Sequence, residues 1–136
     1  MEYDSCIIVG DLDMSTLNLT RVPVDGAFDE LIVTAPISIN NSILVGSVNL
    51  NGAVFQNAAV FSGTRFEGVA FLVDSKFDRT ACFEGAYFKE TPYFDHAHFN
   101  ETADFRDAKF NYFAYFNGAT EGVGLCFVLQ SVIKWA

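Results

Sequence analysis

The hydrophobic positions between Ala53 and Ala119 form a ladder of large residues at regular intervals. The segment reads as twelve triplets, most of the form Ala-x-Phe, and the large residue closes each triplet. The closing residues are separated by six and five positions in strict alternation: Phe55, Phe61, Phe66, Leu72, Phe77, Phe83, Phe88, Phe94, Phe99, Phe105, Phe110 and Phe116. The repeat is therefore eleven residues long, and such regular self-similarity indicates a solenoid whose coils pack on their neighbours.

Each triplet predicts which side chains point inward. The first and third residues lie on one face of an extended strand, because side chains alternate along it. A small residue and a large residue thus share the inward face, which fills a narrow interior without overpacking. At residues 70–72 the alternation is kept only if Leu72 closes the triplet. The sequence therefore predicts that Leu72 points inward and Phe71 outward.

The unequal links predict the number of sides. A three-sided coil would stack five-residue links on six-residue links, whereas a four-sided coil of 22 residues stacks links of equal length. Residues that precede the triplets at five-residue links are mostly types that adopt tight turns: Gly52, Gly63, Asp74, Gly85, His96, Asp107 and Gly118. We therefore expect a quadrilateral coil of about 22 residues.

The amino-terminal part resembles the coil that follows it. Residues 6–19 align with residues 42–55 at an offset of 36, which is 14 more than one 22-residue coil. Because residues 21–30 contain Pro23 and Gly26, we expect a loop bulging from the coil there. The chain 1–136 is thus predicted to be one all-β domain of about five coils. Its inward residues are aliphatic over 6–52 and mostly Phe over 53–121.

The ladder stops at Glu121, which occupies the next inward slot, and residues 122–136 follow. An open solenoid end exposes unpaired backbone groups that invite aggregation. The mostly apolar tail is therefore expected to be a C-terminal cap, either a short helix or an irregular coil. The alternative is a homodimer contact through Val128, Val132 and Trp135.

Composition and charge narrow the function classes. Aromatic residues make up 15% of the 136-residue chain, and the formal net charge is −9, with both signs mixed over residues 53–121. Direct nucleic-acid binding is not expected, because phosphate contacts require clustered Lys and Arg. Three scattered cysteines, Cys6, Cys82 and Cys126, predict neither a disulfide framework nor a metal motif. No signal peptide or membrane span is evident, so a cytoplasmic location is the default expectation.

The run FEGAYFKETPYFDHAHFNETADFRDAKF resembles the pentapeptide-repeat proteins, in their eleven-residue F-x-x-A-x-F-x-x-x-A-x-F variety. The resemblance is close over 53–119 and loose over 6–52. It implies a right-handed quadrilateral β-helix that is not an enzyme and has a structural or protein-interaction role. Some relatives are thought to mimic DNA and bind topoisomerases such as gyrase, which would be the alternative function. The outward columns after the large residues argue against it, because neutral and basic residues interrupt their carboxylates.

Outward residues spaced by 22 positions should stack in columns. One column contains Phe71, Tyr93 and Tyr115, and its neighbour contains Arg65, Tyr87 and Lys109. Since Tyr and Arg are enriched at binding hot spots, these columns are the candidate surface for a protein partner. The alternative is that they only stabilise the sheet by cross-strand stacking.

The remaining polar residues indicate no catalytic chemistry. His96 and His98 lie near Asp95, but a corner and an outward position predict a solvated pair. We expect no catalytic residue, no metal site and no cofactor, since neither a nucleophile motif nor a Gly-rich phosphate loop occurs. Cys82 is predicted to be outward and accessible, and Cys6 to occupy a small inward slot.

Overall fold

The structure is a computed structural model that describes residues 2–13, 20–22, 30–121, 124–127 and 133–134. These residues form strands, turns and connecting segments without a helix, as predicted for an all-β chain. Consequently no helix long and apolar enough to cross a membrane is found among them.

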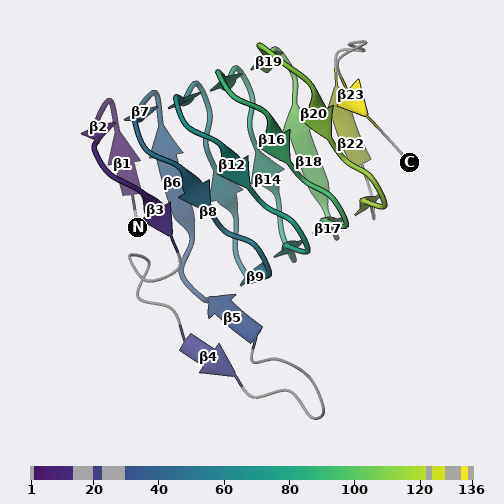
Figure 1. The fold of residues 1–136 in the computed structure, drawn as a ribbon. Helices are drawn as coiled ribbons and strands as arrows, with labels where there is room; N and C mark the ends of the chain where they lie inside the picture. The colour runs from purple at the N-terminus through teal and green to yellow at the C-terminus, as the bar shows by residue number, and fades with distance from the viewer. Residues whose placement is uncertain (1, 14–19, 23–29, 122–123, 128–132, 135–136) are drawn as a thin grey trace.

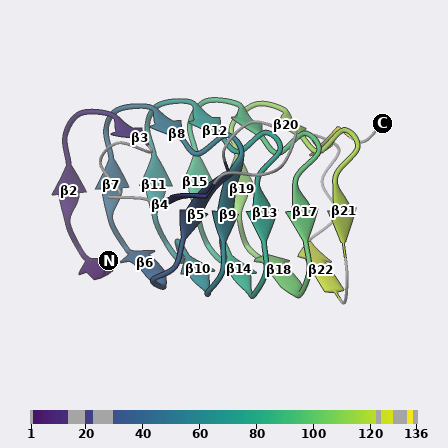
Figure 2. The same cartoon turned by 90° about the horizontal axis from the view of Figure 1, so that it is seen from below.

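The strands form four sheets that make the four sides of a solenoid (Figures 1 and 2). Sheet A contains β1 (Glu2–Asp4), β6 (Ile37–Asn40), β10 (Ala59–Val60), β14 (Ala81–Cys82), β18 (Thr102–Phe105) and β22 (Gly124–Phe127). Sheet B contains β2 (Ile7–Ile8), β7 (Ile43–Leu44), β11 (Arg65–Phe66), β15 (Tyr87–Phe88) and β19 (Lys109–Phe110). Sheet C contains β3 (Leu12–Asp13), β8 (Val48–Asn49), β12 (Ala70–Phe71), β16 (Pro92–Tyr93), β20 (Ala114–Tyr115) and β23 (Ile133–Lys134). Sheet D contains β4 (Thr20–Val22), β5 (Glu30–Val33), β9 (Ala53–Phe55), β13 (Lys76–Phe77), β17 (His98–Phe99) and β21 (Thr120–Glu121).

Parallel pairing confirms the predicted 22-residue coil. Phe66 pairs with Phe88 in sheet B, Phe71 with Tyr93 in sheet C, and Phe77 with Phe99 in sheet D, each 22 residues apart. In Figure 2, the sheet D strands β9, β13, β17 and β21 lie side by side, one from each successive coil. From Ile37 to Glu121 the chain completes about four such turns. The expected number was about five, and the difference arises because the first turn does not follow the 22-residue register.

The first turn has the offset of 36 that the sequence predicted, since Ile7 pairs with Ile43 and Leu12 with Val48. The residues that lengthen this turn do not all form a loop, so the expectation of a loop over the whole of 21–30 is wrong at its ends. Arg21 and Val22 belong to β4, which pairs antiparallel with β5 through Arg21↔Leu31 and Val22↔Glu30. This hairpin extends sheet D by one strand and satisfies backbone groups that a loop would leave to solvent. Figure 1 shows β4 and β5 at one side of the stack.

The described parts of the tail add strands to the last coil. Gly124–Phe127 pairs in parallel with β18, and Ile133–Lys134 pairs with β20. These pairings favour the irregular coil over the short helix among the two forms expected for a cap. Val128, Val132 and Trp135, the candidate contact residues, lie outside the described residues.

The predicted inward residues form the core. Eleven of the twelve ladder residues are at most 2% exposed, including Leu72, and Phe110 is partly buried against them. Phe71 is partly exposed on the outer side, as the spacing predicted. Each buried Phe contributes roughly 1.5–3 kcal/mol of transfer free energy, so the ladder is the main source of stability. Val54 departs from the pattern, because it is only 8% exposed on the outer side of sheet D.

The Phe rings stack in columns that run along the solenoid axis. In sheet B the ring centroids of Phe66 and Phe88 are 4.6 Å apart, at an interplanar angle of 8°. Rings from opposite sheets meet edge to face, as between Phe83 and Phe94, whose planes make an angle of 82°. Offset stacking and edge-to-face packing are the favoured geometries of aromatic pairs, and each adds about 0.5–1.5 kcal/mol beyond area burial.

Inward hydroxyl groups replace Ala at three small slots. Thr64 donates to the carbonyl of Ile39 at 2.6 Å, and Ser75 donates to the carbonyl of Leu72 at 2.7 Å. Ser42 donates to the carbonyl of Asn40 at 2.7 Å. Because these buried hydroxyl groups are hydrogen-bonded, they fill the slots without an unsatisfied polar atom.

Candidate functional site

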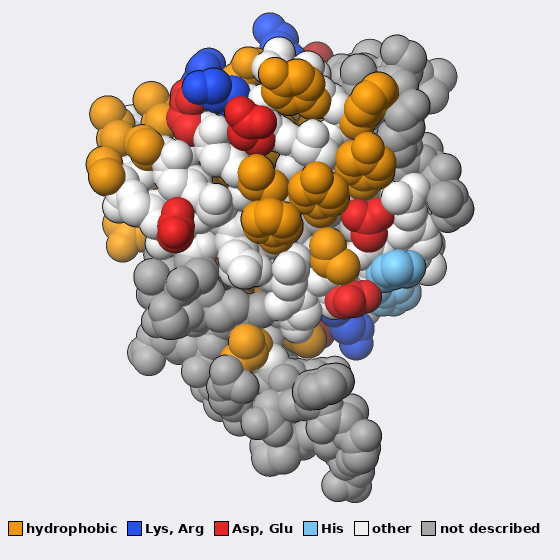
Figure 3. Space-filling view, in the orientation of Figure 1, with side chains coloured by type: hydrophobic (Ala, Val, Ile, Leu, Met, Phe, Trp, Pro, Cys, Tyr) orange, Lys and Arg blue, Asp and Glu red, His pale blue; other side chains and the backbone are white. Residues whose placement is uncertain are grey.

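An aromatic strip lies on the outer side of sheet C. It consists of Phe71, Tyr93 and Tyr115, which occupy equivalent positions of three consecutive strands. The ring centroids are 5.6 and 5.5 Å apart, and the planes are within 8° of parallel. The column predicted from the 22-residue spacing is therefore present. Figure 3 shows hydrophobic side chains gathered on this face of the molecule.

Two further aromatic residues extend this surface, and the sequence argument did not include them. Tyr112 is 55% exposed and Phe113 is 46% exposed, in the corner between sheets B and C that precedes Tyr115. The sequence signal that could have identified them is a departure from the residue types found at this corner in the other coils. Phe113 occupies a position that Val69 and Thr91 hold in the two preceding coils. The corner connects the aromatic strip to the neighbouring sheet.

The second predicted column, Arg65, Tyr87 and Lys109, runs along the outer side of sheet B. The guanidinium carbon of Arg65 lies 4.4 Å from the ring centroid of Tyr87, a cation–π contact. Arg65 also donates to Glu67, and Lys89 Nζ lies 3.2 Å from the other carboxylate oxygen of Glu67. The hydrogen bonds from Arg65 and then Lys89 lower the pKa of Glu67, and the bond to Glu67 raises the pKa of Arg65. The Glu67 carboxylate thus forms ion pairs with both Arg65 and Lys89 on this face.

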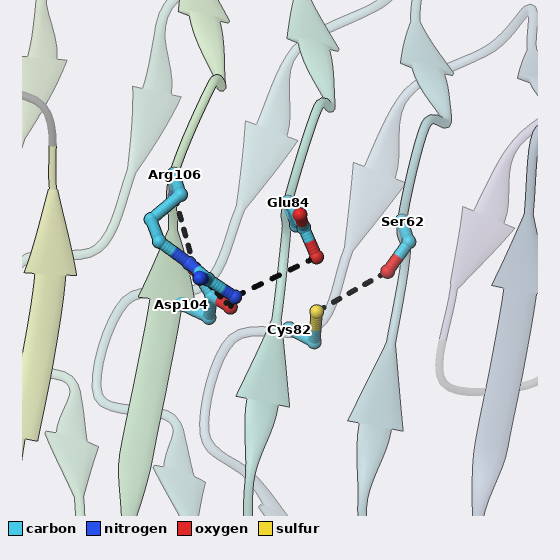
Figure 4. Close-up of polar contacts among 5 residues, drawn as sticks. All are labelled: Ser62, Cys82, Glu84, Asp104 and Arg106. Atoms are coloured by element: carbon cyan, nitrogen blue, oxygen red, sulfur yellow. Dashed lines mark hydrogen bonds and ion pairs between the residues drawn. The ribbon is translucent and has the colours of Figure 1, made fainter.

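A polar cluster lies on the outer side of sheet A, where the 22-residue spacing placed Ser62, Glu84 and Arg106 in one outward column and predicted an outward Cys82. Figure 4 shows Ser62, Cys82, Glu84, Asp104 and Arg106, which come from three consecutive strands. Arg106 donates to both carboxylate oxygens of Asp104, with Nη2 2.7 Å from Oδ2, and lies 3.8 Å from Glu84. Cys82 Sγ lies 3.2 Å from Ser62 Oγ.

The chemistry of this cluster is that of an internal ion pair. The Cys82 thiol and the Glu84 and Asp104 carboxylates have ligand atoms within 4.8 Å of one another. However, Arg106 already occupies the carboxylate oxygens of Asp104, which is only 8% exposed. Its hydrogen bonds lower the pKa of Asp104 and thereby favour the charged form that binds the guanidinium. A metal ion would have to displace this base.

The two histidines do not form a joint site. His96 occupies a corner, with Nδ1 3.8 Å from an Asp74 oxygen. His98 lies on the outer side of β17 and hydrogen-bonds with Thr120. Since each ring faces a different partner across the coils, the arrangement does not resemble a catalytic or metal-binding pair.

The cysteines occupy separate places. Cys6 is partly exposed and donates from Sγ to the carbonyl oxygen of Asp4 at 3.2 Å, while Cys82 is partly exposed on sheet A. Cys126 pairs with Asp104 through the backbone register of β22.

Four sheets of mainly parallel strands around a stacked aromatic core define the class of this protein, a quadrilateral β-solenoid of repeated coils. Residues 83–120, which include Tyr93, Tyr115 and Arg106, match the family model described as pentapeptide repeats (9 copies). This match is consistent with a pentapeptide-repeat protein, the family that the Phe ladder resembles. No curated protein and no solved structure matches the chain. Solenoids of this family generally have structural or interaction roles rather than catalytic ones.

Proposed function

We propose that the protein is an interaction scaffold that binds a protein partner through the aromatic strip of Phe71, Tyr93 and Tyr115. The observation that supports this most directly is the partly exposed stack of Phe71, Tyr93 and Tyr115, with the exposed Tyr112 and Phe113 in the corner that precedes Tyr115. Contiguous exposed apolar surface on a soluble chain is characteristic of interaction sites. Aromatic side chains are enriched at the centre of such interfaces, where water is excluded.

The adjoining column of Arg65, Tyr87 and Lys109 supplies a polar margin to the same surface. Arg65 is held over Tyr87 and by Glu67, so it loses little side-chain entropy when a partner binds. The rigid coils place both columns at fixed spacing, which favours a preformed binding surface over one that orders on binding.

An acidic surface that mimics DNA is not favoured by the charges. Among the described residues, Glu67, Asp78, Glu84, Glu101 and Asp104 all lie within 4.0 Å of a Lys or Arg nitrogen. A mimic of the phosphate backbone requires a continuous row of carboxylates, and these bases interrupt it.

The test is affinity capture from native lysate with the intact chain, followed by binding measurement on the purified partner. We expect Tyr93→Ala and Tyr115→Ser to weaken that binding at least about tenfold, as truncation of interface hot spots does. Tyr3→Ala is the matched control, because Tyr3 is 43% exposed on a different sheet. If the partner binds both strip variants as tightly as the native chain, while their thermal stability falls, the strip serves only cross-strand stacking.

A further inference from the structure

The outer side of sheet B differs from the other three sides of the solenoid in both polarity and charge. Its amino-terminal half, on β2 and β7, presents four aliphatic side chains: Ile7, Val9, Ile43 and Val45. Ile7 and Val9 are 67% and 80% exposed, the most exposed large aliphatic residues among those described. In Figure 3, hydrophobic side chains lie at one end of this side of the molecule, and the blue atoms of Lys and Arg lie further along it.

The carboxyl-terminal half of the same face is basic. Arg65, Lys89 and Lys109 occupy outward positions of three successive coils, with Glu67 as the only carboxylate among the outward positions of this sheet. Arg65 and Lys89 both contact Glu67. Lys109 has no ion pair within the described part of the chain. A chain of net charge −9 thus carries one face with two more bases than acids.

We infer that this face, which we call the sheet B face, binds an acidic segment of a partner polypeptide that is apolar at one end. The acidic part would lie over Arg65, Lys89 and Lys109, and the apolar end over Ile7 and Val9. Five strands at a spacing of about 4.8 Å extend over roughly 19 Å, the length of about six extended residues. This inference rests on the proposed interaction function and specifies the chemistry of the partner.

Charge and shape favour such a segment over other anions. Opposite charge on a local face accelerates and orients binding even when the whole chain is acidic, because distant charges are screened beyond about 10 Å. A nucleic acid would meet the same three bases, but it has no group to cover the aliphatic half. Its further phosphates would also be repelled by the acidic remainder of the chain.

The experiment is a titration of the intact 15N-labelled chain with four probes, followed by NMR. The first probe is an eight-residue peptide of three Leu followed by five Glu, and the second replaces each Glu with Lys. The third is an all-Glu peptide of the same length, and the fourth is a single-stranded oligothymidine of eight nucleotides. We expect the Leu-Glu peptide to bind most tightly and to shift the backbone amides of Arg65, Tyr87 and Lys109.

The variants separate charge from apolar contact. Lys109→Glu should lower the affinity for the Leu-Glu peptide at least about fivefold. The matched control Lys76→Glu makes the same charge change on sheet D and should change that affinity less than about twofold. The double variant Ile7→Ser, Val9→Ser should lower the affinity for the Leu-Glu peptide and leave the affinity for the all-Glu peptide unchanged. These side chains are exposed, so the fold is retained, which thermal unfolding would verify.

The inference is overturned if the Lys peptide or the oligothymidine binds as tightly as the Leu-Glu peptide, or if Lys109→Glu and Lys76→Glu have equal effects. Tyr93→Ala distinguishes the two proposals, because it alters the aromatic strip on sheet C and keeps every side chain of the sheet B face in place. If Tyr93→Ala no longer binds the captured partner, and Lys109→Glu does not change the affinity of the Leu-Glu peptide, the proposed interaction function is supported. The assignment of the sheet B face as the peptide site is then wrong.

Discussion

At the residue scale, the corners of the coil depend on backbone conformation. All seven corner residues predicted at five-residue links have positive φ, between 56° and 70°. They are Gly52, Gly63, Gly85 and Gly118, with Asp74, His96 and Asp107 at the equivalent positions. Gly lacks the Cβ that makes this region costly, and Asp and Asn tolerate it better than other residues. The sequence indicated these positions because turn-forming types recur there.

Substitution of Gly85 tests the cost of the positive φ at a corner, because the added Cβ would not clash with a neighbouring coil. Its φ is +67°, and a Cβ placed there would meet no atom closer than 3.9 Å. We expect Gly85→Val to lower the free energy of unfolding by about 1–2 kcal/mol, because a β-branched residue is strained at this φ.

Gly85→Asn is the control for that substitution, since Asn41 adopts φ of 49° two coils earlier in the same corner. In urea unfolding, Gly85→Asn should lower the free energy of unfolding by less than half as much as Gly85→Val does. Equal losses for the two variants would show that the corner is limited by space and not by backbone conformation.

At the scale of the element, each short strand has one side in the core and one side that couples neighbouring coils. In sheet A the outward side joins β18 to β14 through Arg106, which contacts Asp104 and Glu84. The 22-residue spacing aligns Glu84 with Arg106 and Cys82 with Asp104, but no motif indicates which of these side chains bond to one another. Their proximity results from the 22-residue register.

The Arg106 contacts predict a pH-dependent contribution to stability. The pKa of Asp104 is lowered in the folded state, so its stabilisation is complete above the unfolded pKa near 4 and is lost as pH falls through the folded pKa. Arg106→Gln should therefore destabilise the protein by about 1 kcal/mol at pH 7, since Arg106 is more than half exposed. The difference from the native chain should shrink as the pH is lowered below about 4.

Urea unfolding at several pH values between neutral and strongly acidic would measure this difference. Arg79→Gln is the matched control, because the Arg79–Glu101 pair is exposed on both sides and should contribute little. A difference between Arg106→Gln and the native chain that stays constant across the pH range would contradict the assignment of the stabilisation to charged Asp104.

At the scale of the whole molecule, each coil contacts only its neighbours, so stability is approximately a sum along the axis. The end coils are then decisive, because they have a neighbour on one side only. Gly124–Phe127 and Ile133–Lys134 pair with β18 and β20 and thereby cover one edge of each strand. The remaining tail residues, including Val128, Val132 and Trp135, are still predicted to be a cap or a homodimer contact.

Truncation after residue 121 separates these two roles. If the tail is a cap, its removal exposes the edges of β18 and β20, and we expect a melting temperature lower by roughly 5–10 °C with aggregation in light scattering. A truncated chain that stays monomeric and soluble, where the intact chain is a dimer, would instead identify the tail as an interface.

The sequence alone determined the register of this protein. The six-and-five alternation predicted the four sides, the 22-residue coil, the inward Leu72 and the turn positions, because each depends on local geometry that repeats. The tertiary structure decided what depends on contacts between coils or on irregular segments. It placed Arg106 on Asp104, left Tyr112 and Phe113 exposed in the corner before Tyr115, and paired the ends of the expected 21–30 loop as antiparallel strands. A repeat specifies which positions stack on one another, whereas the hydrogen bonds and ion pairs between those side chains depend on side-chain conformations that the spacing does not set.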